Sequence, residues 1–368
     1  MHKGDHTIQT VANLIVGGGI AGLWLHARAH AAGHSSQLIA PALGGGQTLL
    51  SQGIIHGGTK YALSGALTGA SEAVKAMPQR WLDALAGHGE IDLSDVQLAS
   101  SHQLMIHNDS LSGKVTQFFA SKALRGRVES VTPPEFLPTN TRVYQLSEPV
   151  VDTESLIRSL AKTPGIGAGV VEKIELESGI VTLADGSKIQ AEKIFLCAGE
   201  GTEDLLTQSG LNTPKMQRRP LRMLVGQGPL PELWAHIVGS GTKPLATITT
   251  HNGFWYVGGN IAEQGVDDPD FLSNASKQLQ QLLPSLDLSQ VTWSAVDINR
   301  AEPATENAAR PDNPFVSTQG RITVAWPTKL ALSPALADQV LPLFSTPHSE
   351  PLPWAAPDLA LTPWSANA

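Results

Sequence analysis

A glycine-rich turn between an apolar strand and a helix is the feature that most constrains the fold of this chain. Residues 11–16 (VANLIV) are an apolar, β-branched run typical of a buried parallel strand. Gly17, Gly19 and Gly22 follow in G-x-G-x-x-G spacing, and residues 20–32 have helical composition. The glycines permit a tight turn, a close approach of the backbone to a pyrophosphate, and close packing of helix on strand. Beside a helix N-terminus, this pattern predicts dinucleotide binding; the alternative is a tight strand–helix turn in another α/β protein.

One part of the usual dinucleotide site is absent from the sequence. An acidic residue about 20 residues beyond the glycines normally holds the ribose. Here the second expected strand, residues 37–40, ends in Ala40 and Pro41, and no Asp or Glu occurs between Asp5 and Glu72. Neutral groups must therefore hold the ribose, or the adenosine half of the ligand is bound weakly.

The rest of the chain alternates between strand and helix patterns. A β-meander with turns at residues 177–179 and 185–186 leads into an apolar strand that ends in Ala198 and Gly199. Asp152 or Thr153 is expected to cap a helix. Helices are expected at 64–85, 152–162, 273–283 and 333–344, strands at 103–106, 169–176, 180–183, 193–197, within 219–261, at 291–298 and at 321–325, and a poorly ordered proline-rich tail after 345.

Composition excludes several classes of protein and site. A net charge of −8 argues against a broad nucleic-acid surface, which needs clustered Lys and Arg. Cys197 is the only cysteine, so no intrachain disulfide and no cysteine metal site is expected; the histidines lack metal-ligand spacing, and we predict no metal. No apolar run is long enough to cross a membrane, and no signal-peptide core follows Met1. We expect a soluble, cytoplasmic protein without an integral membrane segment.

Further segments, in order along the chain, carry a resemblance to a known family. They are residues 51–58 (SQGIIHGG), 150–152 (VVD), 171–174 (VEKI), 196–199 (LCAG), 300–303 (RAEP) and 327–330 (PTKL). Together with the glycine turn they resemble the superfamily of FAD-dependent oxidoreductases that contains D-amino acid oxidase and glycerol-3-phosphate dehydrogenase. The resemblance spans residues 12 to about 344, and the Ile-His-Gly-Gly piece is most similar to the glycerol-3-phosphate dehydrogenase branch.

The resemblance implies FAD as cofactor and an α/β fold, with a Rossmann-like FAD-binding domain and an α+β substrate domain built on a mixed or antiparallel sheet. FAD-binding segments would be 1–80, 146–218 and 297–368 (which includes the C-terminal tail), and substrate-domain segments 81–145 and 219–296. The residues expected to bind FAD are Gly17, Gly19, Ile20, Ala21, Gly22, Gln47, Thr48, Ser51, Gln52, Gly53, Ile54, Val171, Ala198, Gly199, Thr328, Lys329 and Leu330.

Three residues are candidates for the chemistry. His56 is expected to line the reactive face of the flavin as a polar contact or proton acceptor; covalent attachment of the flavin and a loop histidine without a role are alternatives. Arg300 would clamp a substrate carboxylate or phosphate, unless it pairs with Glu302 or Asp297. Lys329 replaces a glycine usual in the family and would stabilise the charge of a reduced flavin, or else is a surface lysine that caps a turn.

Two other features carry a structural and a functional interpretation. Cys197 is expected to pack in a buried strand end rather than to react. Phe254, Trp255 and Tyr256 lie in one strand, so Trp255 is expected to face the opposite side from its neighbours. Core packing is favoured for these aromatic residues over a role as the roof of the substrate pocket.

The sequence therefore predicts an FAD-dependent dehydrogenase or oxidase of a small substrate. The donor is expected to be a CH–OH carbon of an anionic compound such as a glycerol phosphate or a 2-hydroxy acid, with oxygen or a quinone as electron acceptor. The alternatives are oxidation of an amino acid or secondary amine, a non-catalytic protein that keeps the fold, and an NAD-dependent dehydrogenase.

Overall fold

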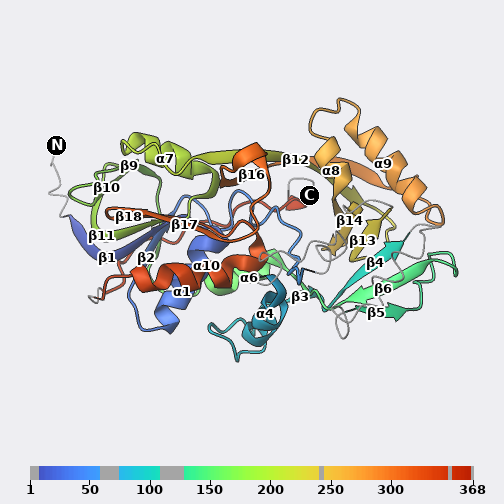
Figure 1. The fold of residues 1–368 in the computed structure, drawn as a ribbon, viewed down its shortest axis with the longest axis horizontal. Coiled ribbons are helices and arrows are strands. Elements are labelled where there is room, and N and C mark those ends of the chain that lie inside the picture. Colours follow the sequence, from blue (N-terminus) through green and yellow to red (C-terminus); the bar gives the residue numbers. More distant parts are fainter. Residues whose placement is uncertain (1–7, 59–73, 108–127, 240–243, 347–349, 366–368) are drawn as a thin grey trace.

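The sheet that carries the glycine-rich turn combines segments far apart in the sequence (Figure 1). The computed structural model describes residues 8–58, 74–107, 128–239, 244–346 and 350–365. In pairing order the strands are β17, β18, β11, β1, β2 and β8, with β10 on β11 and β9 on β10. The central pairs are parallel, as in α/β dinucleotide domains. The bounds are β1 Gln9–Val16, β2 Gln37–Ala40, β8 Ile166–Ala168, β9 Val171–Ile174, β10 Ile180–Leu183, β11 Lys188–Leu196, β17 Phe315–Gln319 and β18 Ile322–Trp326.

Helices cover both faces of this sheet. On one face α1, α6 and α10 bury apolar side chains against Ile15, Leu38 and Phe195. On the other, α7 packs with β9 and β10. Asp152 caps α6, as predicted, because its carboxylate accepts the Ser155 N–H at 2.7 Å. The helix bounds are α1 Ile20–Ala31, α4 Met77–Leu85, α6 Thr153–Leu160, α7 Thr202–Gln208 and α10 Ser333–Val340.

A second eight-stranded sheet forms the other half of the molecule (Figure 1). Its order is β16, β12, β15, β14, β13, β4, β6 and β5, antiparallel except for the parallel pair of β13 with β4, so the sheet is mixed. Helix α9 covers one face, and β12 and β16 extend toward the first sheet. The bounds of its strands and helices are β4 Gln103–His107, β5 Val128–Val131, β6 Arg142–Leu146, β12 Met216–Gln227, β13 Ala235–Val238, β14 Pro244–His251, β15 Phe254–Gly258, β16 Thr292–Pro303, α8 Asn260–Gln264 and α9 Phe271–Leu282. Two short strands, β3 Leu98–Ser100 and β7 Val150–Val151, form a separate two-stranded sheet.

Several predicted bounds and one predicted state need correction. Strand β16 runs to Pro303 rather than ending at 298, because it pairs with β12 along its whole length. Helix α10 ends at Val340, where Pro342 follows, and a short 3₁₀ turn replaces the expected last turn. The tail prediction was wrong for residues 350–365, since this segment packs on both sheets. The first part of the helix predicted at 64–85 lies outside the described residues.

No helix in the described part of the chain is both long and apolar enough to span a membrane.

Candidate active site

The glycine turn after β1 has the close contacts that the sequence predicts. Gly17 has a φ of 124°, and a Cβ there would lie 2.4 Å from the carbonyl oxygen of Cys197. A Cβ on Gly22 would lie 2.0 Å from the Gly17 carbonyl oxygen. The Ile20 N–H at the start of α1 donates to the Thr48 hydroxyl at 3.0 Å. These contacts hold the N-terminus of α1 against the turn, with further helix N–H groups that have no carbonyl partner inside the helix.

A cavity of about 1200 Å³ begins at this turn and extends between the two sheets. Of the predicted cofactor residues, Gly22 alone is not in its wall, because Gly22 faces the Gly17 backbone. Thr48 and Gln52 also have structural contacts: the Gln52 amide donates to the carbonyl oxygens of Thr247 and Tyr256, both at 2.9 Å. The predicted residues in the wall are Gly17, Gly19, Ile20, Ala21, Gln47, Thr48, Ser51, Gln52, Gly53, Ile54, His56, Val171, Ala198, Gly199, Arg300, Thr328, Lys329 and Leu330.

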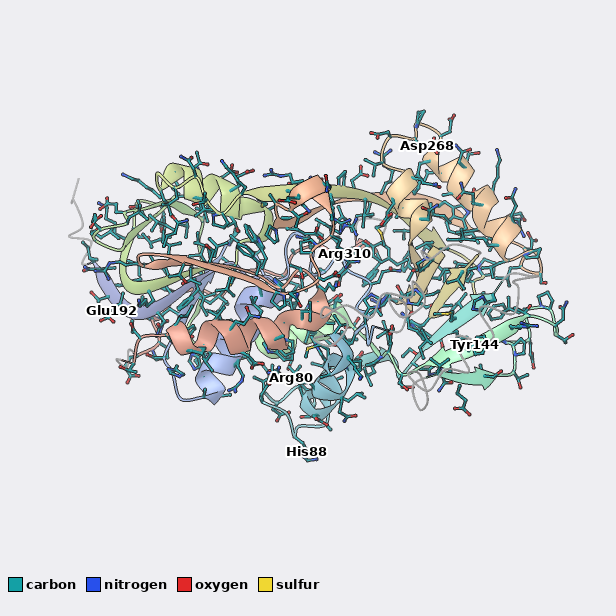
Figure 2. All side chains as sticks on the ribbon, in the orientation of Figure 1. Arg80, His88, Tyr144, Glu192, Asp268 and Arg310 are labelled. Atoms are coloured by element: carbon teal, nitrogen blue, oxygen red, sulfur yellow. The ribbon has the colours of Figure 1, made fainter. Side chains whose placement is uncertain are left out.

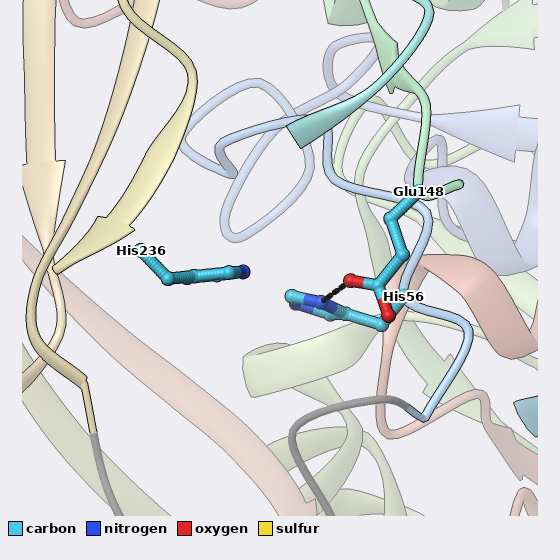
Figure 3. A group of neighbouring side chains, drawn as sticks. All are labelled: His56, Glu148 and His236. Atoms are coloured by element: carbon cyan, nitrogen blue, oxygen red, sulfur yellow. Dashed lines mark hydrogen bonds and ion pairs between the residues drawn. The ribbon is translucent and has the colours of Figure 1, made fainter. Parts of the chain in front are cut away.

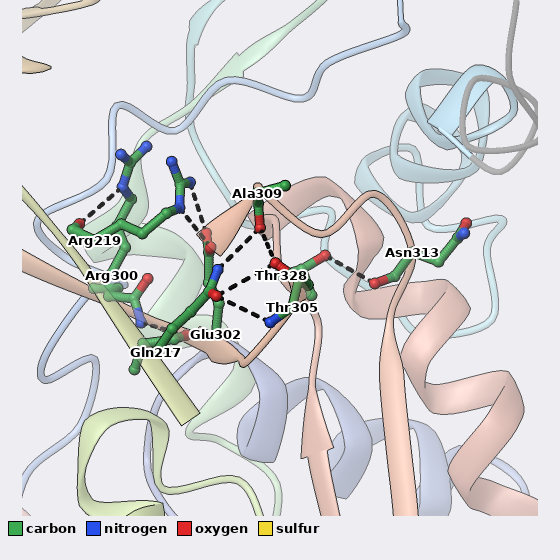
Figure 4. A network of polar contacts seen from close by, with 10 residues as sticks. Gln217, Arg219, Arg300, Glu302, Thr305, Ala309, Asn313 and Thr328 are labelled. Carbon is green, nitrogen blue, oxygen red and sulfur yellow. Dashed lines mark hydrogen bonds and ion pairs between the residues drawn. The ribbon is translucent and has the colours of Figure 1, made fainter. Parts of the chain in front are cut away.

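The loop before α10 is unusual in its backbone and its charge. Thr328 has a φ of 62°, a left-handed conformation that glycine adopts more readily, and its hydroxyl donates to the Asn313 carbonyl oxygen (Figure 4). Lys329 is only 6% exposed, so the surface-lysine alternative is wrong. Its ammonium lies 3.3 Å from an Asp312 carboxylate oxygen. A buried, paired cation therefore lines the cavity here.

His56 meets two residues that the sequence analysis did not single out, Glu148 and His236 (Figure 3). His56 Nδ1 lies 3.4 Å from Glu148 Oε2, and the rings of His56 and His236 are 5.9 Å apart and tilted by 24°. The Gly57 N–H donates to Glu148 Oε1 at 2.9 Å, and His236 Nδ1 lies 2.9 Å from the Thr247 hydroxyl. Both histidines line the cavity, so a buried carboxylate orients an imidazole toward it.

Burial and charge act in opposite directions on Glu148. Its side chain is 2% exposed, and burial alone would raise its pKa. The hydrogen bond and charge of His56, the charge of His236 and the Gly57 N–H outweigh burial and lower the pKa of Glu148 to about 2. Glu148 is therefore ionised at neutral pH and acts as a fixed negative partner for His56.

Three arginines, Arg219, Arg300 and Arg310, line another part of the cavity. Figure 4 shows Arg219 and Arg300 with their polar partners. Arg219 makes a two-pronged ion pair with Glu302, at 2.7 and 2.9 Å. Arg222 pairs with Asp297 in the same way. Among the described residues Arg300 forms no ion pair with Glu302 or Asp297, so the predicted pairing is wrong, although the charge of Glu302 lies close enough to act on Arg300.

Arg300 itself donates its Nε–H to the Arg219 carbonyl oxygen at 3.3 Å. Burial, followed by the nearby charges of Arg219 and Arg310, lowers the pKa of Arg300 to about 10. Arg310 lines the same cavity and lies between the two sheets in the view of Figure 2. Within the described ranges neither Arg300 nor Arg310 forms an ion pair, so these two guanidinium groups make this end of the cavity attractive to an anion.

The aromatic residues 254–256 and Cys197 contribute to packing rather than to chemistry. Trp255 packs in the core beneath α9, whereas Phe254 and Tyr256 pack in a separate cluster, which confirms the predicted alternation. None of the three is in the wall of the cavity, so they do not form its roof. Cys197 is 5% exposed, and burial raises the pKa of its thiol to about 12. Its thiol is therefore protonated and unreactive, as predicted.

The residues that the sequence analysis missed come from distant parts of the chain. Glu148 reaches His56 because residues 53–55 pair with 149–151: the Ile55 N–H donates to the Pro149 carbonyl oxygen, and the Val151 N–H to the Gly53 carbonyl oxygen. His236 is brought in by β13 of the second sheet. The only signal in the sequence was a lone Glu before an apolar strand, which is too common to identify a site.

Comparisons with known proteins agree with this arrangement. The sequence profile of the family described as FAD dependent oxidoreductase matches residues 14–324. The chain belongs to this family. It is 48% identical over 347 residues to the probable FAD-dependent oxidoreductase PA4991 of Pseudomonas aeruginosa, with 89% of each chain covered. The crystal structure of that protein superposes with a TM-score of 0.84, at 39% identity over 98% of this chain and 99% of the other.

More distant family structures share the fold. Glycine oxidase from Geobacillus kaustophilus has a TM-score of 0.67 at 16% identity, covering 93% of this chain and 97% of the other. L-proline dehydrogenase from P. horikoshii has a TM-score of 0.68 at 14% identity, covering 92% and 94%. This chain is therefore an FAD-dependent oxidoreductase, and the predicted alternatives of an NAD-dependent dehydrogenase and a non-catalytic protein are wrong.

The residues present fit FAD as the family's cofactor. The glycine turn leaves no room for a Cβ at Gly17 or Gly22 and brings bare backbone to the cavity wall. The start of α1 offers N–H groups to a diphosphate. The residues that line the cavity extend from the end of β2, through the glycine turn, to Lys329 before α10.

Proposed function

We propose that this flavoenzyme oxidises the CH–OH carbon of a small anionic substrate, such as a glycerol phosphate or a 2-hydroxy acid. The observation that carries the proposal is the His56–Glu148 pair in the same cavity as Arg300 and Arg310. FAD, when bound, supplies the acceptor for the hydride. The protein then has to remove the hydroxyl proton and hold the anion.

His56 would take the hydroxyl proton. Its Nδ1–H donates to the Glu148 carboxylate, which leaves the Nε2 lone pair as the base. The ionised Glu148 stabilises the imidazolium that forms as the alcohol becomes a carbonyl. An amine that binds in its neutral form already carries the lone pair that stabilises its product, so it needs no base at this step. The pair therefore favours a hydroxy compound over an amino acid or secondary amine.

Arg300 and Arg310 would hold the anionic end of the substrate. Their guanidinium groups present several N–H donors in a fixed plane, a shape that matches carboxylate and phosphate oxygens. Arg219 is committed to Glu302 and keeps the strand pair β12–β16 in register. Fixing the anion in this way orients the CH–OH carbon, and the second sheet excludes water from the cavity.

The first experiment measures the visible spectrum of the purified protein before and after acid precipitation. Flavin that leaves with the supernatant is noncovalent, whereas colour kept in the pellet is evidence for attachment at His56. The holoenzyme is then mixed without oxygen with 2-hydroxy acids, glycerol phosphate, uncharged glycerol and amino acids of matching skeleton. We expect bleaching with an anionic hydroxy compound, and bleaching by amino acids alone would overturn the proposal.

Variants test the base directly. We expect His56→Asn and Glu148→Gln to slow flavin reduction by about 10²- to 10⁴-fold with little change in substrate Kd, the range typical of a general base. His88→Asn, at an exposed histidine, is the matched control. The reduced enzyme is then exposed to air or to a soluble quinone, and the faster reoxidation identifies the electron acceptor.

His56, Glu148 and His236 could instead bind a metal ion, since each offers one ligand atom. Their candidate ligand atoms lie within 4.8 Å of one another, whereas ligand atoms around a tetrahedral zinc lie about 3.3 Å apart. The absence of a metal stays a prediction. Dialysis against EDTA should leave the rate of flavin reduction unchanged. If EDTA lowered this rate and added zinc restored it, the three residues would be metal ligands and His56 would not be the base.

A further inference from the structure

The adenosine end of the FAD cavity lacks the acid that usually holds the ribose. The end of β2 contributes Pro41 and Ala42 to the wall, both without a polar side chain. Next to it lies the segment before β9, because the Gly169 N–H donates to the Ala40 carbonyl oxygen at 3.0 Å. Gly169 and Val171 line the cavity at this end. The described wall of the cavity contains three acidic residues, Glu200, Asp204 and Glu263, and one of them lies on an element packed beside β9.

Helix α7 is that element. It contacts β9, and three of its side chains, Asp204, Leu205 and Gln208, belong to the cavity wall. Residues four positions apart lie one above the other on the same face of a helix. Asp204 and Gln208 thus place two neighbouring polar groups on the face of α7 that lines the cavity.

The other acidic residues of the described cavity wall are already engaged. Glu200 accepts hydrogen bonds from Arg218 at 3.1 Å and from Asn299 at 3.2 Å. Glu263 lies near Arg300, at the opposite, cationic end. For Asp204 neither a hydrogen bond nor an ion pair occurs within the described ranges, although Glu203 beside it pairs with Arg218 at 2.8 Å.

We infer that Asp204 of α7 takes the place of the missing acid, its carboxylate accepting a hydrogen bond from a ribose hydroxyl of the adenosine half of FAD, with Gln208 as a second polar contact. A carboxylate is a strong acceptor for a hydroxyl group. This assignment depends on FAD being the cofactor and is independent of which substrate is oxidised.

The test compares the affinities of the apoprotein for FAD and FMN, followed by the quenching of flavin fluorescence. FMN lacks adenosine, so Asp204→Ala should raise the Kd of FAD about ten- to a hundred-fold and leave the Kd of FMN unchanged. Glu203→Ala is the matched control, since Glu203 is also an acid in the first turn of α7 but is absent from the cavity wall. It should change neither affinity.

A second ligand separates a ribose contact from a general effect on α7. FAD with a 2′-deoxyribose in its adenosine half should bind the wild-type apoprotein more weakly than FAD, and this difference should shrink in Asp204→Ala. Equal losses for FAD and FMN, or the same loss in Glu203→Ala, would assign Asp204 to helix stability and overturn the inference. Because no turnover is measured, failure of the proposed substrate class leaves this result unaffected.

Discussion

Glu148 is a buried, ionised carboxylate at the candidate site. Ionised carboxylates are rarely buried unless charges or hydrogen-bond donors surround them. Glu148 has His56, His236 and the Gly57 N–H around it. His56 and Gly57 belong to one loop, and His236 belongs to β13 of the second sheet. The same contacts that would orient the base therefore make the fold sensitive to acid.

The stability conferred by Glu148 should depend on pH. Its pKa falls from an ordinary 4.5 to about 2 on folding, so its ionised form stabilises the folded state above pH 4.5, and this stabilisation is lost as the pH falls toward 2. Thermal unfolding of Glu148→Gln should show a deficit on the order of 3 kcal/mol at pH 6 that shrinks below pH 4.5. Glu154→Gln, from an exposed pair with Arg158, should cost less than about 1 kcal/mol throughout. A deficit that stays constant down to pH 3 would contradict this account.

At the scale of elements, β1, the glycine turn and α1 form one closely packed unit whose backbone groups touch. β1 and α1 approach so closely that the Gly17 and Gly22 backbones are in contact. Such contacts leave little room for adjustment, since interiors are packed like crystals. The unit therefore tolerates no added side-chain atom at these two positions.

Gly22→Ala should both destabilise the protein and weaken FAD binding. The new Cβ would lie 2.0 Å from the Gly17 carbonyl oxygen, so α1 has to move away from the turn. We expect a loss of about 1–3 kcal/mol in urea unfolding of the apoprotein and a higher FAD Kd. Gly201→Ala is the control for the unfolding measurement, because its Cβ would come no closer than 3.9 Å to Ala198 and its φ is −73°. Similar behaviour of the two variants would show that close packing at Gly22 is unimportant.

For the whole molecule, the C-terminal segment links the two sheets. Leu359 forms a β-bridge with Leu43, beside the glycine turn. Trp364 lies further on, 6% exposed, and stacks on His251 of β14 at 5.2 Å and 15°. The segment thus runs from the FAD-binding sheet to the second sheet. The domain boundaries predicted from the sequence stay a prediction.

Trp364→Ala should lower stability by about 3 kcal/mol, the size expected for removing a buried tryptophan. Leu361→Ala is the matched control within the same segment, since Leu361 is 72% exposed. Its effect should stay within about 0.5 kcal/mol. Chemical denaturation of both variants measures the difference, and equal stabilities would mean that the segment does not hold the sheets together.

The sequence by itself determined the FAD-binding half, because its signals are local. A β-branched run, a glycine spacing and a cap at Asp152 each act within a few residues, and the structure confirms them at β1, α1, β2 and α6. The same locality made the aromatic alternation at residues 254–256 predictable. His56, Arg300 and Lys329 were singled out by the resemblance to the family rather than by a local pattern, and all three line the cavity.

Tertiary structure alone decided what those residues face. His56 and Glu148 are 92 positions apart and meet through pairing of residues 53–55 with 149–151. Glu302 pairs with Arg219 of the neighbouring strand β12 rather than with Arg300, two residues away in its own strand. Lys329 is buried and pairs with Asp312, which precedes it by 17 residues across the hairpin of β17 and β18. Strand pairing and burial depend on the whole chain, and no short window of sequence contains that information.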